Sequence, residues 1–189
     1  IASHNMLVIE SNIEQRIDVI ARCRKVYFGY VIEMILLNLV VIGVGFNNNF
    51  YEYDNEETKL EKGVEMLRYL RERTKSLVSS IGLYNHGDWF GEPENQIKIL
   101  KELNDPGVGL IYNFHHAHKQ IDSFPTLLKK MSPWLWTVNL NGMKKDGSQI
   151  LTIGEGDQEK EMLRLLKNSG FQGSIGILGH IETEDVEQV

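Results

Sequence analysis

Apolar runs and amphipathic segments alternate along the chain from about residue 77 onward. The apolar runs predict strands at 77–85, 108–114, 134–140, 150–153 and 174–178. Between them, apolar residues at helical spacing predict helices that begin at Pro93, near Phe124 and shortly before Met162. Strands that alternate with helices in this way indicate parallel β/α units, and unbroken apolar character is typical of strands buried on both faces.

The first part of the chain carries two amphipathic segments around one long apolar run. Helical spacing of apolar residues predicts helices at 12–25 and 56–75. The run between them, 26–46, is long enough to cross a membrane, but Glu33 and Asn38 would then lie in the hydrocarbon. We therefore favour a buried helix that leads into a core strand, and keep a membrane-associated protein as the third and weakest functional hypothesis.

The alternation predicts an α/β protein of the (β/α)8 TIM-barrel type, in one domain that covers 1–189. Such barrels typically take about 250 residues, whereas this chain has 189. We therefore predict a barrel that is shortened or incomplete on its N-terminal side. The strand edges of an incomplete barrel need cover, and a homo-oligomer of identical chains is one way to provide it.

The composition of the chain limits which kinds of partner and which cell compartment we expect. The chain has 20 basic and 26 acidic residues, a formal charge of −6, which argues against a nucleic-acid partner because phosphate backbones need a basic face. Cys23 is the single cysteine, so an internal disulfide is excluded. The first residues do not read as a signal peptide. These features predict a cytoplasmic location, and the small-molecule partner follows from the strand-end residues and the resemblance described below.

Asparagine and histidine gather directly after the ends of successive predicted strands. They are Asn85 and His86, then Asn113, His115, His116 and His118, then Asn139 and Asn141, and finally His180. In a parallel barrel these ends face one mouth, where barrel enzymes build their active sites. Each residue alone reads best as a turn or capping residue. Taken together they predict a binding site at the mouth.

Two segments are candidates for a metal site or a phosphate site. Three histidines lie within 115–118 and could ligate a transition metal. On an extended segment His115 and His116 would point to opposite sides, so that only His116 and His118, or one of them with His86, would converge. The segment 154–157 lacks the pattern of a phosphate loop, and we predict that it places Glu155 while Asp157 caps the following helix.

Several blocks of the chain, in this order and spacing, resemble the sugar phosphate isomerase/epimerase family of xylose isomerase-like barrels. They are Leu-Tyr-Asn-His-Gly at 83–87, Asn-Phe-His-His-Ala-His at 113–118, Trp-Thr-Val-Asn-Leu at 136–140, Gly-Glu-Gly-Asp at 154–157 and Gly-Phe-Gln-Gly-Ser-Ile at 170–175. The resemblance is clear for about 77–189 and weak before 56. It implies a TIM barrel and a role in carbohydrate metabolism.

The chain departs from that family at the positions of its metal ligands. The family's members bind a divalent metal through Glu, Asp, His and Glu at consecutive strand ends, where this chain has Tyr84, Asn113, Asn139 and Leu178. A hard divalent cation needs anionic oxygen ligands, so the usual metal cofactor is doubtful. Two alternatives stay open: a metal-free site, or an imidazole site built from some of His86, His116, His118 and His180.

The resemblance and the strand-end residues together predict a sugar isomerase or epimerase that moves a proton next to a carbonyl. The predicted catalytic base is His116 or Glu155, since a histidine titrates near neutral pH. The predicted substrate-binding residues are His86, Asn113, His118, Asn139 and Lys145, the last for an anionic group. The alternative is a non-catalytic carbohydrate-binding barrel that has lost the family metal site.

Overall fold

The computed structural model describes residues 29–36, 39–46, 53–75, 79–87 and 89–178, and these build one six-stranded sheet. The strands follow one another across the sheet in chain order. They are β1 (Gly29–Leu36), β2 (Leu39–Phe46), β3 (Ser79–Tyr84), β4 (Val108–Asn113), β5 (Leu135–Leu140) and β6 (Ser174–Ile177). β1 pairs antiparallel with β2, and every later pair is parallel. The predicted parallel β/α units are therefore confirmed.

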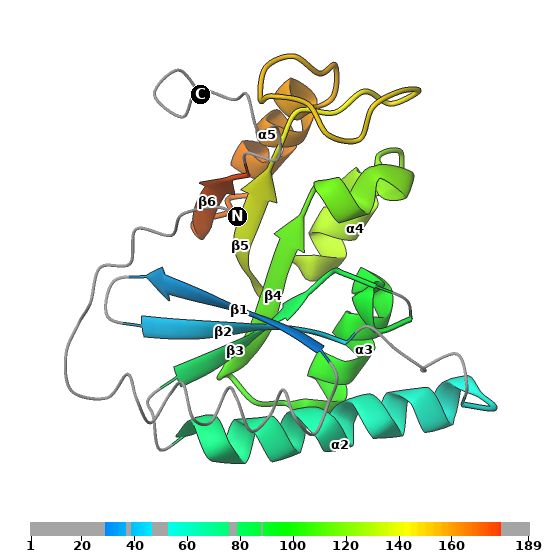
Figure 1. The fold of residues 1–189 in the computed structure, drawn as a ribbon, viewed down its shortest axis with the longest axis vertical. Helices are drawn as coiled ribbons and strands as arrows, with labels where there is room; N and C mark the ends of the chain where they lie inside the picture. The colour runs from blue at the N-terminus through cyan, green and yellow to red at the C-terminus, as the bar shows by residue number, and fades with distance from the viewer. Residues whose placement is uncertain (1–28, 37–38, 47–52, 76–78, 88, 179–189) are drawn as a thin grey trace.

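The described helices lie along one side of the curved sheet (Figure 1). They are α2 (Glu56–Lys75), α3 (Pro93–Leu103), α4 (Phe124–Met131) and α5 (Glu159–Asn168), with short 3₁₀ turns η2 (Trp89–Gly91) and η3 (His115–Gln120). α3 begins at Pro93, whose missing N–H is not needed in a first turn. It ends at Asn104, which takes the left-handed conformation with φ 48°. The start at Pro93 agrees with the sequence prediction.

The main hydrophobic core lies between the helices and one face of the sheet. Ile81, Leu83, Leu110 and Val138 point to this face and are at most 1% exposed. The helical partners are Val64, Leu67, Ile97, Leu100, Leu128, Met162 and Leu166, which belong to the same cluster. Burial of these side chains is the dominant favourable term in the fold. The opposite face of the sheet is thereby left to form the inner side of the barrel.

The hydrophobic core is less well covered at β6, the last described strand. Ile175 and Ile177 lie in register with the buried Val138 and Leu140 of β5, on the helix-facing side. They are nevertheless 49% and 52% exposed. Among the described residues no helix covers them, which fits a barrel that is present only in part.

Two expectations from the sequence are wrong. The apolar run 26–46 contains the strands β1 and β2 rather than a helix, in keeping with its many β-branched residues. No helix among the described residues is long and apolar enough to cross a membrane.

The segment 150–153 is not a strand: Leu151 makes an isolated antiparallel bridge with Gly142, and β5 pairs directly with β6, which leaves no place between them. The helix expected at 12–25 lies outside the described residues.

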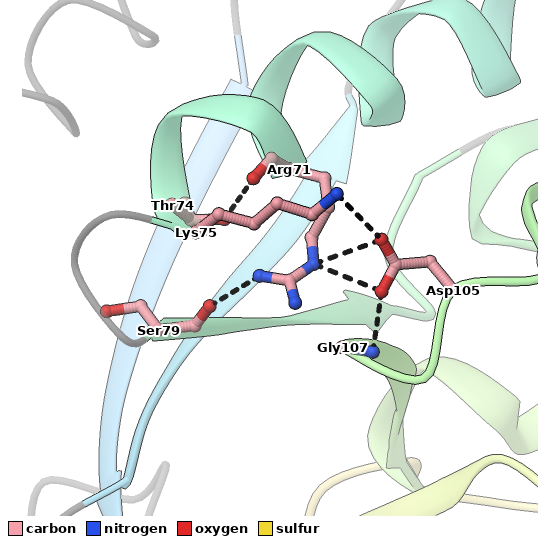
Figure 2. Close-up of polar contacts among 6 residues, drawn as sticks. All are labelled: Arg71, Thr74, Lys75, Ser79, Asp105 and Gly107. Atoms are coloured by element: carbon pink, nitrogen blue, oxygen red, sulfur yellow. Dashed lines mark hydrogen bonds and ion pairs between the residues drawn. The ribbon is translucent and has the colours of Figure 1, made fainter.

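A polar clamp holds α2 to the amino ends of β3 and β4 (Figure 2). The Nε atom of Arg71 donates to the Asp105 carboxylate at 3.2 and 3.3 Å, and its Nη1 donates to the Ser79 carbonyl at 2.9 Å. The same carboxylate accepts the Gly107 N–H at 2.8 Å. The Arg71 and Asp105 side chains are only 17% and 21% exposed. The clamp lies at the end of the sheet away from the mouth.

Candidate functional site

The carboxyl ends of β3 and β4 bring Tyr84 and Asn113 together on the inner face of the sheet. Tyr84 is the last residue of β3 and is 8% exposed, and Asn113 is the last residue of β4 and is fully buried. The Tyr84 ring packs with Ile111 and Trp136, away from the main core. The Asn113 amide donates a short hydrogen bond from Nδ2 to the Tyr84 hydroxyl.

Asn85 joins the two strand ends through its side-chain amide. Its Nδ2 donates to the Asn113 carbonyl at 3.0 Å, and its Oδ1 accepts the Asn113 N–H at 2.7 Å. The amide thus pairs with the Asn113 backbone as another strand residue would. Asn85 therefore has a structural role, because a buried backbone group without a partner costs stability.

The Asn113 side chain also starts the turn η3. Its Oδ1 accepts the N–H of His115 at 3.0 Å, a local bond that asparagine commonly makes where a strand ends. The chain then enters a 3₁₀ turn instead of continuing as an extended segment. The premise that His115 and His116 point to opposite sides of an extended chain does not hold.

Three imidazole rings and the Tyr84 ring form a compact group, the mouth cluster: Tyr84, His86, His115 and His116. The His86 and His116 rings meet edge to face with centroids 4.5 Å apart. The His116 ring lies 5.4 Å from that of Tyr84 and stacks on that of His115 at 4.5 Å. His86, His115 and His116 are partly exposed, so that a ligand can reach them. The predicted convergence of His116 with His86 is therefore observed.

Burial raises the pKa of the Tyr84 hydroxyl, and the hydrogen bond from Asn113 opposes the shift only in part. The hydroxyl is therefore a neutral phenol at physiological pH. A neutral phenol can donate its own hydrogen while it accepts one from Asn113.

Asn139 lies beside Asn113 at the end of β5. The two residues are register partners in the parallel pair β4–β5, so their side chains share the inner face. Asn139 is 8% exposed, and its carbonyl accepts the N–H of Phe114 at 3.0 Å. A Cβ atom at Gly176 would lie 2.8 Å from the Asn139 Oδ1, so a glycine at that position gives this amide room.

Two of the other predicted site residues, His118 and Lys145, have partners that are not members of the mouth cluster. The His118 Nε2 is 2.7 Å from the Lys144 carbonyl, and Lys145 is paired with Asp122. Glu155 is exposed on the loop before α5. His180 lies outside the described residues.

The loop before α5 is organised by Glu159 rather than by Asp157. Asp157 accepts the N–H of Lys145 at 3.0 Å and does not cap α5, whose N-cap is Gln158, so the capping prediction is wrong. The buried Glu159 carboxylate accepts backbone N–H groups of Gly154, Gly156 and Gln158. A glutamate inside the first turn gives little sequence signal of such a role.

The sequence places Tyr84 and His115 at strand ends of the mouth, but the sequence analysis predicts no binding or catalytic role for either. Tyr84 stands at the end of an apolar run, where an aromatic residue reads as core. The signal that could reveal it is its place directly before Asn85 and His86, at the strand end where the other polar residues gather. His115 has no predicted role because an extended segment would turn it away from His116, whereas 115–120 forms the turn η3.

The residues present do not fit a divalent metal of the usual kind. Within the described part of the chain, no three His, Cys, Asp or Glu side chains are placed to hold a metal ion. The mouth cluster contains no carboxylate, and the Asn113 amide presents its N–H, rather than its oxygen, toward Tyr84. A hard cation needs oxygen lone pairs at these points.

Solved structures of sugar epimerases share this architecture. A D-tagatose 3-epimerase-like protein matches with a TM-score of 0.56 and 22% identity, over 73% of this chain and 54% of its own. The 3-keto-D-glucoside 4-epimerase YcjR of E. coli matches with a TM-score of 0.58 and 16% identity, over 78% and 59%. The fold is that of a TIM barrel.

A further solved neighbour is the IolI protein with a bound zinc atom, with a TM-score of 0.54 and 16% identity, over 89% of this chain and 62% of its own. This chain therefore spans little more than half the length of the solved barrels it matches. No protein-family model and no curated protein sequence matches it. At these sequence identities the comparisons establish only the fold. Any inference about chemistry therefore has to be drawn from the residues at the mouth of the barrel.

Proposed function

We propose that this chain binds a sugar or sugar derivative at the mouth of its barrel and acts as an isomerase or epimerase by proton transfer next to a carbonyl. The observation that carries the proposal is the mouth cluster itself. Rings of Tyr84, His86 and His116 meet at the carboxyl ends of β3 and β4, where barrel enzymes place their chemistry. The sugar epimerases among the solved neighbours support the choice of a sugar.

His116 is the proposed base. Its ring is partly exposed, so a substrate carbon can approach it, and it meets the rings of Tyr84 and His86 edge to face. A base must come within hydrogen-bond reach of the proton that it removes. Glu155 is the weaker candidate, because it is exposed on the loop before α5, whereas the His116 ring contacts other rings of the cluster.

The remaining polar groups of the mouth are proposed to bind and orient the sugar. Asn139 faces the inner side beside Asn113, and His86 borders the base directly. Asn113 acts through the group that it holds, since both ends of its amide have protein partners. Lys145 would have to leave Asp122 in order to meet an anionic substituent, which favours an uncharged sugar.

An enzyme that removes and returns a proton next to a carbonyl in D₂O incorporates deuterium at that carbon, whichever product the reaction forms. D-tagatose, D-psicose, D-fructose and a 3-keto-D-glucoside are incubated with the protein in D₂O and followed by NMR. We expect deuterium at the carbon next to the carbonyl of at least one of them. If none exchanges while at least one binds, the isomerase proposal is refuted.

The change His116→Gln separates catalysis from binding. The glutamine keeps a hydrogen-bonding side chain and removes the titratable ring. If His116 is the base, the exchange rate falls by roughly 10²-fold or more while sugar affinity changes little. An exchange rate that stays within about twofold of the wild type would assign the base elsewhere, with Glu155→Gln as the next variant.

A carbohydrate-binding barrel without catalysis is the second candidate. It is favoured by the absence of any carboxylate in the mouth cluster, at positions where the resembling family uses acidic metal ligands. Binding without exchange in the D₂O experiment is the result that selects it.

A further inference from the structure

The pair Tyr84–Asn113 occupies two positions at which the resembling family places acidic metal ligands. These positions are the last residues of two neighbouring strands, β3 and β4, so their side chains share the inner face. In this chain the two side chains bond directly to each other. The question is what the pair does in place of holding a cation.

The orientation of the Asn113 amide is fixed by its surroundings. The backbone N–H of His115 lies 3.0 Å from Oδ1, and a backbone N–H can only donate. The oxygen of the amide is therefore on the side of η3, and the NH₂ group must face Tyr84. An N–H hydrogen thus points where a cation would need a lone pair.

The Tyr84 hydroxyl accepts this hydrogen bond and keeps its own hydrogen for another acceptor. Among the described residues, the structure shows a hydrogen bond that the Tyr84 hydroxyl accepts and none that it donates. The ring is held by Ile111 and Trp136 on one side, and the imidazole rings of His86 and His116 border it. The phenol stays protonated, since burial raises its pKa.

We infer that the Tyr84 hydroxyl takes the place of the divalent cation at this mouth and donates a hydrogen bond to an oxygen of the bound sugar, with Asn113 as its positioning residue. The inference rests on the proposed sugar site. The bond from Asn113 withdraws electron density from the phenol oxygen and so strengthens the donor, as chains of hydrogen bonds do. A buried phenol would bind the oxygen that the cation binds in the resembling family, without its charge.

The first arm of the test measures sugar binding by the full 189-residue chain and two single variants. Tyr84→Phe removes the hydroxyl and keeps the ring. Tyr112→Phe is the matched control, because Tyr112 is also a buried tyrosine, on the next strand, and it belongs to the main core. With D-tagatose, D-psicose and D-fructose as probes, we expect Tyr84→Phe to weaken binding by about tenfold, the scale of one hydrogen bond, and the control to leave it unchanged.

The second arm measures Mn²⁺ binding by electron paramagnetic resonance, without any sugar. We expect no specific binding to the wild type at millimolar Mn²⁺. The double variant Tyr84→Glu with Asn113→Asp restores two carboxylates, and we expect its affinity for Mn²⁺ to exceed that of the wild type by roughly tenfold or more. Thermal unfolding of each variant verifies that it is folded.

The outcomes separate the inference from the function on which it rests. Stoichiometric, tight Mn²⁺ binding by the wild type overturns the inference whatever the sugar results are. Sugar binding that is equal in wild type and Tyr84→Phe overturns the donor role and leaves the proposed function intact. If none of the probes binds to the wild type, the proposed function fails, and the donor role fails with it.

Discussion

Replacing Asp105 with asparagine should destabilise the protein in a way that depends on pH. The Asp105 carboxylate receives the Arg71 Nε at 3.2 and 3.3 Å and the Gly107 N–H at 2.8 Å (Figure 2). Asparagine keeps the shape of the side chain and an oxygen for Gly107. It loses the charge that the guanidinium of Arg71 faces.

The size of the effect follows from the burial of the pair. A hydrogen bond to a charged group contributes about 1.5–3 kcal/mol, and removing one partner of a fully buried ion pair costs about 3–5 kcal/mol. Here the two side chains are 17% and 21% exposed, and Arg71 keeps its bond to the Ser79 carbonyl. We therefore expect a loss of about 2 kcal/mol at pH 7, or a fall in Tm of roughly 4–8 °C for a chain of this size.

The sign of the pH dependence follows from the pKa of Asp105. Burial raises this pKa, but the Gly107 N–H and Arg71 outweigh burial, so the folded value lies below the ordinary 3.8. A group with a depressed folded pKa contributes stability above its unfolded pKa, and that stability is lost as pH falls through the folded value. The difference between wild type and Asp105→Asn should accordingly be full at pH 7 and shrink as the pH falls below about 4.

Urea unfolding followed by circular dichroism at pH 7 and at several acidic values measures both predictions. Asp122→Asn is the matched control, because Asp122 forms an ion pair with Lys145 but is 78% exposed, and exposed pairs contribute little. The reasoning is refuted if Asp105→Asn costs no stability at pH 7. It is also refuted if the loss is as large at acidic pH as at neutral pH.

Two further predictions concern the strand ends and the loop before α5. Asn85→Ala should lower the free energy of unfolding by about 2–4 kcal/mol, because it leaves the buried N–H and C=O of Asn113 without the Asn85 amide as partner. Asn85→Asp should retain part of this stability. Urea unfolding of both variants measures the two effects. Glu159→Gln should speed hydrogen exchange at the amides of Gly154 and Gly156, which donate to its carboxylate, and leave exchange in β3 unchanged; equal protection in variant and wild type would contradict it.

The fold could be predicted from the sequence wherever local pattern and tertiary context agree. α2 spans 56–75 as predicted, because its apolar residues recur at helical spacing along the whole segment. α4 likewise begins at Phe124 and ends at Met131. For the run 26–46 the length favours a helix, yet a long apolar run can equally be two strands. Its β-branched residues are the better guide.

The candidate site could be predicted only as a set of strand ends. Parallel strands bring their carboxyl ends to one edge, so the proximity of His86, Asn113 and Asn139 follows from the topology alone. The direction of each side chain does not follow, because one hydrogen bond from His115 to Asn113 turns the chain into η3. Within this turn His116 meets His86, whereas His118 bonds to the Lys144 carbonyl.

Asn113 links the fold to the chemistry proposed for the mouth. Its backbone pairs with the Asn85 amide, its Oδ1 starts η3, and its Nδ2 holds the Tyr84 hydroxyl. The position of His116 and that of the phenol are therefore set by one residue at the end of a buried strand. A site held in this way keeps its geometry without a ligand, which lowers the entropy lost on binding. For the same reason a change at Asn113 should disturb the base and the donor together, so single changes at Tyr84 and His116 are the ones that resolve their separate roles.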